Sequence, residues 1–380
     1  MKNKSRVIAI GPLSDLKNKR FTGQSVMFDG TVDFFRKSGL EVSVVDINQS
    51  VLNGSVIRRC LDYLKIFAVF FWTCITKKFD VAYLTSSLGK AGIYRDMIFV
   101  SVLHLFHIKI VIHQFGADIS GTSSIHGLSK KWFNRTLRHI SYILVEGEYI
   151  KKLFDEIPET AGKIRVIPNG LPLEGKNIGK CKIYDNNRPF QLFYLSNLIY
   201  SKGWFDVLQA VNLLVNEYHL DVRCTFAGRF LDSLDDEKPG ISSKQVFDDY
   251  VATHSLKEYI EYYVGLYGEE KDEFFSRSNV FLLPTYYINE GQPVSIIEAM
   301  AYGCVPIVTN YRHIPMMVNE SNGIYVEPRS PESIAAAINS LIQNPQTYRE
   351  KSKACIEDYQ TNFTFAVYTS RIINYIKSLL

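Results

Sequence analysis

Residues 279–310 read NVFLLPTYYINEGQPVSIIEAMAYGCVPIVTN. The stretch contains two short apolar runs, Val280–Leu283 and Val305–Val308, separated by a polar loop and a helix-length segment. Pro293 is suited to the first position of that helix, and Val294–Ala301 has the composition to continue it. A strand, a loop, a helix and a second strand in this order are typical of a parallel sheet covered by helices.

The same alternation of short apolar runs and amphipathic segments extends through the whole chain. In the first half, strands are predicted at Arg6–Ile10, Glu41–Asp46, Val81–Leu84, Ile108–His113, Tyr142–Val145 and Ile164–Ile167. In the second half, they are predicted at Gln191–Leu195, Val222–Ala227, Ile260–Tyr263, Val280–Leu283, Val305–Val308 and Gly323–Val326. Leu171 to Pro189 is rich in Gly, Asn, Lys and Pro and is predicted to be a linker. The pattern predicts two Rossmann-like doubly wound α/β domains, residues 1–180 and 181–364, facing across a ligand-binding cleft.

Composition agrees with a globular protein of about two domains. The chain has 380 residues, 46% of them hydrophobic, which excludes disorder, collagen and a disulfide miniprotein. Its six cysteines are scattered, so neither a zinc site nor a disulfide framework is predicted, and a reducing cytoplasm fits best. The apolar run near the start is too short for a signal peptide, and the run from Leu61 to Ile75 is interrupted by Lys65. No transmembrane segment is predicted.

Charge is divided unequally between the two halves. Residues 1–180 carry 26 basic and 15 acidic side chains, whereas residues 181–380 carry 17 basic and 24 acidic ones. A basic half attracts nucleic acid, anionic lipid or a phosphorylated substrate, and charge alone does not choose among them or exclude a basic surface without a partner.

The loop and helix at 284–301 carry the residues best placed for chemistry. The backbone N–H groups of Val294 and Ser295 are expected to be unpaired at the helix start, where they form an anion site suited to a diphosphate. Glu290 precedes this start and Glu298 follows it by about one turn, so both can accept hydrogen bonds from hydroxyls beside the diphosphate. A nucleotide sugar has this layout. Glu290 itself is predicted to lie in an exposed loop. The alternative is a helix-capping Glu290 with a solvated Glu298.

This segment resembles the signature of the retaining glycosyltransferases of family four, which have the GT-B fold. The matching elements are PTYY, EGQP, IIEAMAYG and the spacing of the two glutamates. The resemblance implies that Glu298 holds the ribose of the donor and that Glu290 contacts the transferred sugar. It also implies an acceptor site in the first domain, reaction with retention of configuration, and a last helix (365–380) that packs back on the first domain.

Two further segments agree with the resemblance and predict contacts to the diphosphate. Gly23, in TGQSVMFDG, lies at the expected start of a helix that runs to about Lys37, where a missing side chain lets backbone approach a phosphate. In YLSNLIYSKGW, Lys202 is placed to neutralise the leaving diphosphate. Asn197 stands where the family usually has an Arg, and Arg229 is predicted to compensate. Gly23 as an ordinary loop glycine and Lys202 as a solvated lysine are the alternatives.

Two other stretches provide further candidates. His113 ends a predicted strand, and the resemblance implies that it lies near the donor sugar, with Asp118 as a lesser candidate. A lone histidine is more often structural, so that alternative stays open. EYYVGLYG resembles the stretch that meets the nucleotide base, which makes Leu266 and its neighbours Gly265 and Tyr267 base contacts.

The function expected is therefore transfer of a sugar from a UDP- or GDP-sugar to a glycan or lipid-linked acceptor in bacterial polysaccharide or lipopolysaccharide biosynthesis. Because amides and Lys202 can bear the diphosphate charge, no metal and no other cofactor are expected. A degenerate homologue that binds without turnover is the main alternative. A dehydrogenase has no G-x-G-x-x-G after the first strand to support it, and nucleic-acid binding has no recognised motif.

The basic first half also predicts peripheral contact with an anionic membrane. The run IFAVFFWTCI, rich in aromatic residues, is flanked by Arg58, Arg59, Lys65, Lys77 and Lys78. Together they could form a basic amphipathic surface for anionic lipid. A buried core helix with basic ends is the alternative.

Overall fold

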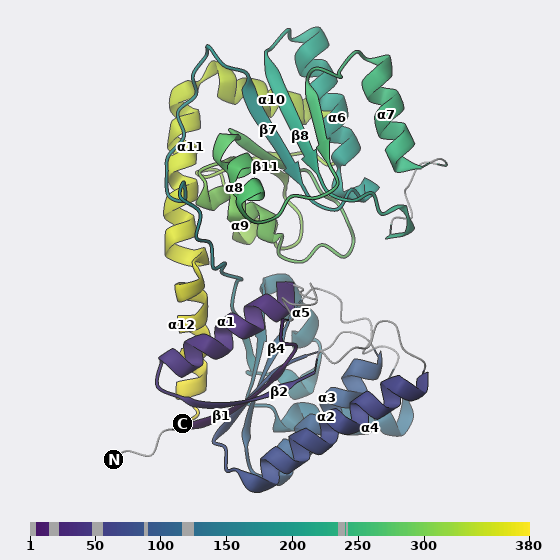
Figure 1. Cartoon of the computed structure of the whole chain (residues 1–380), viewed down its shortest axis with the longest axis vertical. Helices are drawn as coiled ribbons and strands as arrows, with labels where there is room; N and C mark the ends of the chain where they lie inside the picture. Colours follow the sequence, from purple (N-terminus) through teal and green to yellow (C-terminus); the bar gives the residue numbers. More distant parts are fainter. Residues whose placement is uncertain are drawn as a thin grey trace. The chain divides into compact units, whose positions relative to one another are not determined.

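The computed structural model describes residues 5–14, 23–47, 56–86, 90–115, 125–234, 240 and 242–380. It divides into two compact units, one formed by Met1–Pro168 with Ala366–Leu380 and the other by Asn169–Phe365 (Figure 1). Each unit contains one six-stranded sheet in which all neighbouring strands are parallel.

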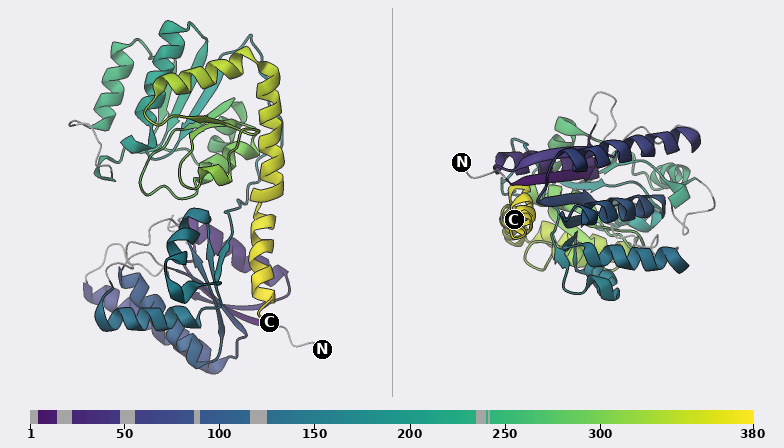
Figure 2. Two further views of the ribbon diagram at one scale, coloured as in Figure 1. Left: turned by 180° about the vertical axis from the view of Figure 1, so that it is seen from behind. Right: turned by 90° about the horizontal axis from the view of Figure 1, so that it is seen from below.

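The sheet of the first unit has the order β2-β1-β3-β4-β5-β6. Its strands are β1 (Arg6–Gly11), β2 (Glu41–Asp46), β3 (Val81–Thr85), β4 (Lys109–Gln114), β5 (Tyr142–Val145) and β6 (Ile164–Val166). Its helices are α1 (Gly23–Lys37), α2 (Val56–Thr76), α3 (Lys90–Leu105), α4 (Gly127–His139), α5 (Glu148–Asp155) and α12 (Phe365–Lys377). The helices cover both faces of the sheet, as Figure 2 shows from two further directions.

The sheet of the second unit has the order β12-β11-β10-β7-β8-β9. Its strands are β7 (Phe190–Leu195), β8 (Val222–Ala227), β9 (Ile260–Tyr263), β10 (Val280–Leu283), β11 (Val305–Thr309) and β12 (Ile324–Val326). Its α-helices are α6 (Trp204–Asn212), α7 (Ser243–Thr253), α8 (Gly268–Arg277), α9 (Val294–Ala301), α10 (Pro331–Gln343) and α11 (Pro345–Asp358). All residues of β10 and β11 are buried, which explains their continuous apolar sequence, because helices cover a parallel sheet on both faces.

The predicted fold class is confirmed. All twelve predicted strands are present, and each end lies within one residue of its predicted position. Helix α9 spans the predicted residues, although Pro293 directly precedes the helix instead of being its first residue. None of the helices in the described residues is long and apolar enough to span a membrane.

The boundary between the units falls after Pro168, earlier than the predicted boundary after Lys180. Hydrogen bonds explain the difference: the Leu171 amide donates to the Phe363 carbonyl at 3.0 Å, and the Gly179 amide donates to the Ala301 carbonyl at 2.9 Å. The segment predicted to be a linker is therefore hydrogen-bonded to the second unit at these two points.

Helix α12 belongs to the first unit, although it is the last helix of the chain. The Tyr375 ring lies 5.3 Å from the Tyr142 ring between centroids, and Lys109 Nζ donates to the Leu379 carbonyl at 2.5 Å. The expected return of the last helix to the first domain thus has direct contacts behind it.

Candidate functional site

The second unit has its topological switch point between β7 and β10. From β7 the chain adds β8 and β9 on one side, and it then adds β10, β11 and β12 on the other side. Ligands of open parallel sheets bind at the carboxyl ends of the strands at this point. The loop after β7 carries Lys202, and the loop after β10 carries Glu290. Topology therefore brings together two candidate residues that lie far apart in the sequence.

A glycine allows the two loops to pack closely. Gly203 has φ +77°, and a Cβ at this position would lie 2.6 Å from the Pro284 carbonyl oxygen. A backbone hydrogen bond of 2.8 Å from the Tyr286 amide to the Ser201 carbonyl fastens the same contact. Only glycine fits both the left-handed conformation and the close approach, so the short 3-10 turn Tyr200–Lys202 is held against the second loop.

Glu290 is buried, which corrects the expectation of an exposed loop residue. Its side chain is 6% exposed, and Lys202 Nζ lies 3.3 Å from Glu290 Oε1 with the lysine side chain 15% exposed. The Thr285 hydroxyl donates to the other carboxylate oxygen at 2.8 Å. A buried carboxylate needs such partners, and here they hold it in one orientation beside a cation.

The start of α9 has the geometry expected for an anion site. Val294 and Ser295 are its first two residues, and within the described chain their amides have no hydrogen-bond acceptor. Val294 is 44% exposed, so this helix start is open to a ligand. Exposed amides at a helix N-terminus favour a phosphate group.

Glu298 lies one turn inside α9 and is buried, which rules out the solvated alternative. Lys271 Nζ, on α8, approaches Glu298 Oε1 to 2.6 Å. Burial raises the pKa of the Glu298 carboxyl, and the Lys271 ammonium partly opposes that rise. The second glutamate is thus also paired with a lysine.

A pocket of about 310 Å³ lies at the ends of β7, β8 and β9. Asn197, Arg229 and Leu266 line it, together with Gly265 and Tyr267. Arg229 and Asn197 thus line the same pocket, and the compensating role of Arg229 stays a prediction. The volume is at the lower end of the range for small-molecule sites and suits one nucleoside.

His113 is fully buried in the first unit, at the next-to-last position of β4. Its Nδ1 is 2.7 Å from the Tyr83 hydroxyl, and its ring lies 5.9 Å from that of Tyr368 on α12. Burial lowers the pKa of His113 to about 3, so the ring is neutral. Its Nε2 has no partner within the described residues. A contact between His113 and the donor sugar stays a prediction.

The two remaining candidates belong to the first unit. Gly23 is the first residue of α1, as predicted, and its contact with a phosphate stays a prediction. Asp118 lies outside the described residues.

Sequence reasoning missed Lys271 and Thr285. Lys271 stands in the charged run GEEKDEFFSR, which looks like an ordinary solvated helix face. Thr285 is part of the quoted PTYY motif, and its place five residues before Glu290 was the available signal.

The fold and this arrangement first define a class. Two doubly wound units, with lysine–glutamate pairs and an open helix start in the second, form a chain of the GT-B type. A family model then matches residues 182–360, described as glycosyl transferases group 1. This match covers most of the second unit, which comprises residues 169–365.

Curated relatives match over part of their length. An uncharacterized glycosyltransferase of Haemophilus influenzae is 32% identical over 93 residues, which are 23% of this chain and 25% of the relative. Glycogen synthase of Mycobacterium tuberculosis is 23% identical over 289 residues, 70% of this chain and 65% of the relative. In each case the match spans less than two thirds of the relative's own length.

Solved structures match over nearly the whole chain. A glycosyltransferase from Rickettsia africae has a TM-score of 0.73 at 15% identity and covers 99% of both chains. Anabaena HepE in complex with UDP has a TM-score of 0.69 at 13% identity, over 98% of this chain and 100% of that one. The lipopolysaccharide outer core galactosyltransferase WaaB has a TM-score of 0.67 at 13% identity, over 99% and 100%. At these identities the likeness establishes the shared fold.

Proposed function

We propose that this chain transfers a sugar from a nucleotide-sugar donor to a glycan or lipid-linked acceptor. The observation that carries the proposal is the pair of buried glutamates at the switch point of the second unit. Each has a lysine within 3.3 Å or less, and the open helix start lies between them in the sequence. A family match over the same unit supports this assignment.

The roles of the site residues follow from their chemistry. The pocket lined by Asn197, Arg229 and Leu266 takes the base, and Glu298 accepts hydrogen bonds from the ribose hydroxyls. The Val294 and Ser295 amides receive the diphosphate. Lys202 stabilises the negative charge that the diphosphate gains as its bond to the sugar breaks, and Glu290 positions both Lys202 and the sugar.

The reaction we propose exchanges one bond for another at the anomeric carbon. The bond from that carbon to the diphosphate oxygen breaks, the acceptor hydroxyl oxygen takes its place, and the hydroxyl proton leaves with the diphosphate. Retention of configuration and metal independence are part of the proposal. Lys202 and the helix amides support the latter, because they supply positive potential where the charge develops.

The donor and the acceptor are proposed from solved structures that share the fold. A UDP-sugar, or otherwise a GDP-sugar, is our choice of donor, since HepE structures are described in complex with UDP and with UDP-glucose. WaaB, described as an outer core galactosyltransferase, supports an acceptor of the lipopolysaccharide or envelope polysaccharide type. We place the acceptor on the first unit and the reaction on the cytoplasmic side of the membrane.

The test measures release of nucleotide from UDP-, GDP-, ADP- and CDP-sugars, with a bacterial envelope lipid extract as acceptor. We expect release from one nucleotide class, unchanged by EDTA and reduced at least about 100-fold in Glu290→Gln. Glu261→Gln is the matched control, because Glu261 pairs with Arg277 at 2.7 Å on the exposed surface. Normal turnover in Glu290→Gln would remove its role. Donor binding without turnover in the wild type would support the degenerate homologue.

A further inference from the structure

Helix α2 of the first unit is apolar on two opposite faces. Ile66, Phe70 and Cys74 follow each other at intervals of four residues and are at most 4% exposed. They pack into the core, where Phe70 meets Phe99 of α3 at 4.7 Å between ring centroids. This face packs α2 against the core of the first unit.

The opposite face of α2 is apolar and exposed. Leu61, Leu64, Trp72 and Ile75 are spaced for one helical face and are 52%, 64%, 69% and 54% exposed. The alternative of a simple buried core helix with basic ends is therefore excluded. An exposed tryptophan inside an apolar stripe marks a binding surface more strongly than scattered single residues do.

Helices α3 and α4 continue this surface beside α2, as Figures 1 and 2 show. Trp132 Nε1 of α4 donates to Ser101 Oγ of α3 at 3.0 Å, which fixes the two helices side by side. Leu105 of α3 is 71% exposed and Leu128 of α4 is 83% exposed. Of the eighteen exposed large hydrophobic side chains in the described residues, nine lie on these three helices. We call this surface the outer helical face.

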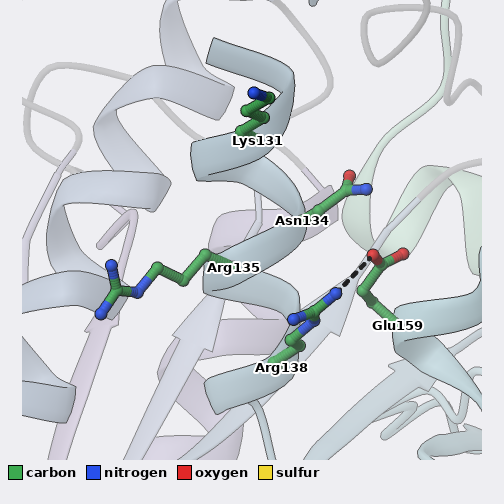
Figure 3. Close-up of a pocket in the computed structure, with 5 residues that line it drawn as sticks. All are labelled: Lys131, Asn134, Arg135, Arg138 and Glu159. Carbon is green, nitrogen blue, oxygen red and sulfur yellow. Dashed lines mark hydrogen bonds and ion pairs between the residues drawn. The ribbon is translucent and has the colours of Figure 1, made fainter. Parts of the chain in front are cut away.

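The third helix of this face, α4, contributes positive charge. Helix α4 carries four Lys or Arg residues and no Asp or Glu. Three of the four, Lys131, Arg135 and Arg138, line a pocket of about 460 Å³ with Asn134 and Glu159. Figure 3 shows these basic side chains spread along the helix and pointing in different directions. Side chains spread in this way can each meet a separate anionic group, whereas a single small ligand would need them to converge.

We propose that the outer helical face docks on an anionic lipid bilayer, with the α2 stripe in the headgroup region and the α4 side chains on lipid phosphates. Charge complementarity selects this occupant, because a second copy of the chain would bring the same positive face. Trp72 suits the boundary between headgroups and acyl chains. The hydroxyls of Thr73 and Thr76 already donate to carbonyls of their own helix, at 2.7 and 2.8 Å, so they need no water there.

Flotation of the full chain with vesicles tests the proposal without any donor or turnover. We expect binding to vesicles of phosphatidylcholine with about one third phosphatidylglycerol in low salt, and weak binding to pure phosphatidylcholine or at about 0.5 M NaCl. Leu64→Ser with Trp72→Ser should lower the apparent affinity at least about tenfold. Both side chains are exposed, so the fold should tolerate the change.

Two further measurements separate this proposal from its rivals. Ile183→Ser with Leu234→Ser, at positions 70% and 53% exposed in the second unit, is the matched control and should bind as the wild type does. In a Trp132→Phe background, brominated lipids should quench Trp72 fluorescence and leave the signal of buried Trp204. Absence of vesicle binding, wild-type binding by the double variant, or a solution dimer that the double variant dissolves would overturn the proposal. None of these outcomes bears on sugar transfer in the second unit.

Discussion

The candidate site of the second unit and helix α4 of the first unit use charge in opposite ways. In the second unit, Lys202 and Lys271 are drawn inward and each meets a buried glutamate. In the first unit, the α4 lysines and arginines stay outside, and the only carboxylate among the pocket-lining residues is Glu159, 3.4 Å from Arg138. Buried pairs hold groups in one orientation for chemistry, whereas an exposed and uncompensated surface attracts an extended anionic partner. We therefore expect that mutations can change the candidate site of the second unit and the outer helical face of the first unit independently.

Breaking the buried pair should have the largest effect. Lys202→Ala removes the proposed cation and leaves Glu290 buried without it, so we expect nucleotide release to fall about 100-fold or more. Stability should also fall, by on the order of 1–3 kcal/mol. The measurement is steady-state turnover with a thermal melt, and vesicle binding should not change.

Lys244→Ala is the control for this variant. Its ion pair with Asp248 is exposed, and surface pairs contribute about 0–1 kcal/mol. Equal losses in the two lysine variants would contradict the distinction between buried and exposed charge.

Changing the second pair should affect binding more than turnover. Glu298→Gln keeps the shape of the side chain but loses the charge that Lys271 meets and one acceptor for the ribose. We expect the donor Kd to rise about tenfold, with kcat at saturating donor reduced much less. Calorimetric titration and turnover together measure both quantities. A fall in kcat without any change in Kd would assign Glu298 to the chemical step instead.

The contact between the loops after β7 and β10 can be tested by substituting glycines. Gly203→Ala puts a Cβ 2.6 Å from the Pro284 carbonyl oxygen at φ +77°, so we expect a loss of roughly 2 kcal/mol and lower turnover. Gly268→Ala has φ +54° and no atom within 4 Å of its Cβ, so it should lose only about 1 kcal/mol from backbone strain. Chemical denaturation compares them. Similar losses would show that the close approach has no energetic weight.

The smallest expected effects have opposite signs in the two units. His113 has a pKa lowered to about 3 by burial, so the unfolded state binds its proton first and stability falls below pH 6.5. Asp206 on α6 has a pKa raised to about 6, so the folded state binds its proton first and stability rises as pH falls through 6. From pH 7 to 5 these contributions are about −2 and about +1 kcal/mol.

Variants isolate each contribution. His113→Phe should lose less stability than the wild type between pH 7 and 5, and Asp206→Asn should lose more. Thermal melts at both pH values provide the comparison. If both variants keep the wild-type pH dependence, neither group titrates differently in the folded and unfolded states.

The fold followed from the sequence because parallel strands buried on both faces are continuous apolar runs. Strand β10 shows this most clearly, since all of its residues are apolar and buried and it was predicted to the residue. Turn residues between them marked the loops, and the Glu290 to Glu298 spacing placed both residues around the start of α9.

Burial and partners of the site residues did not follow from the sequence. Glu290 is buried because Gly203 lets the Lys202 loop approach, a contact between segments more than eighty residues apart. His113 is covered by Tyr368 of α12, from the far end of the chain. Such contacts depend on tertiary packing, which strand and helix periodicity does not encode.

The most direct measurement is the melting temperature of the wild type and Glu298→Gln with UDP-, GDP-, ADP- and CDP-sugars, each with and without EDTA. Because a ligand that binds only the folded state stabilises it, a donor at about 100 times its Kd adds about 2.7 kcal/mol. We predict a rise with one nucleotide class in the wild type, unchanged by EDTA and much reduced in the variant. No rise with any of the four classes would contradict a nucleotide-sugar site in the second unit.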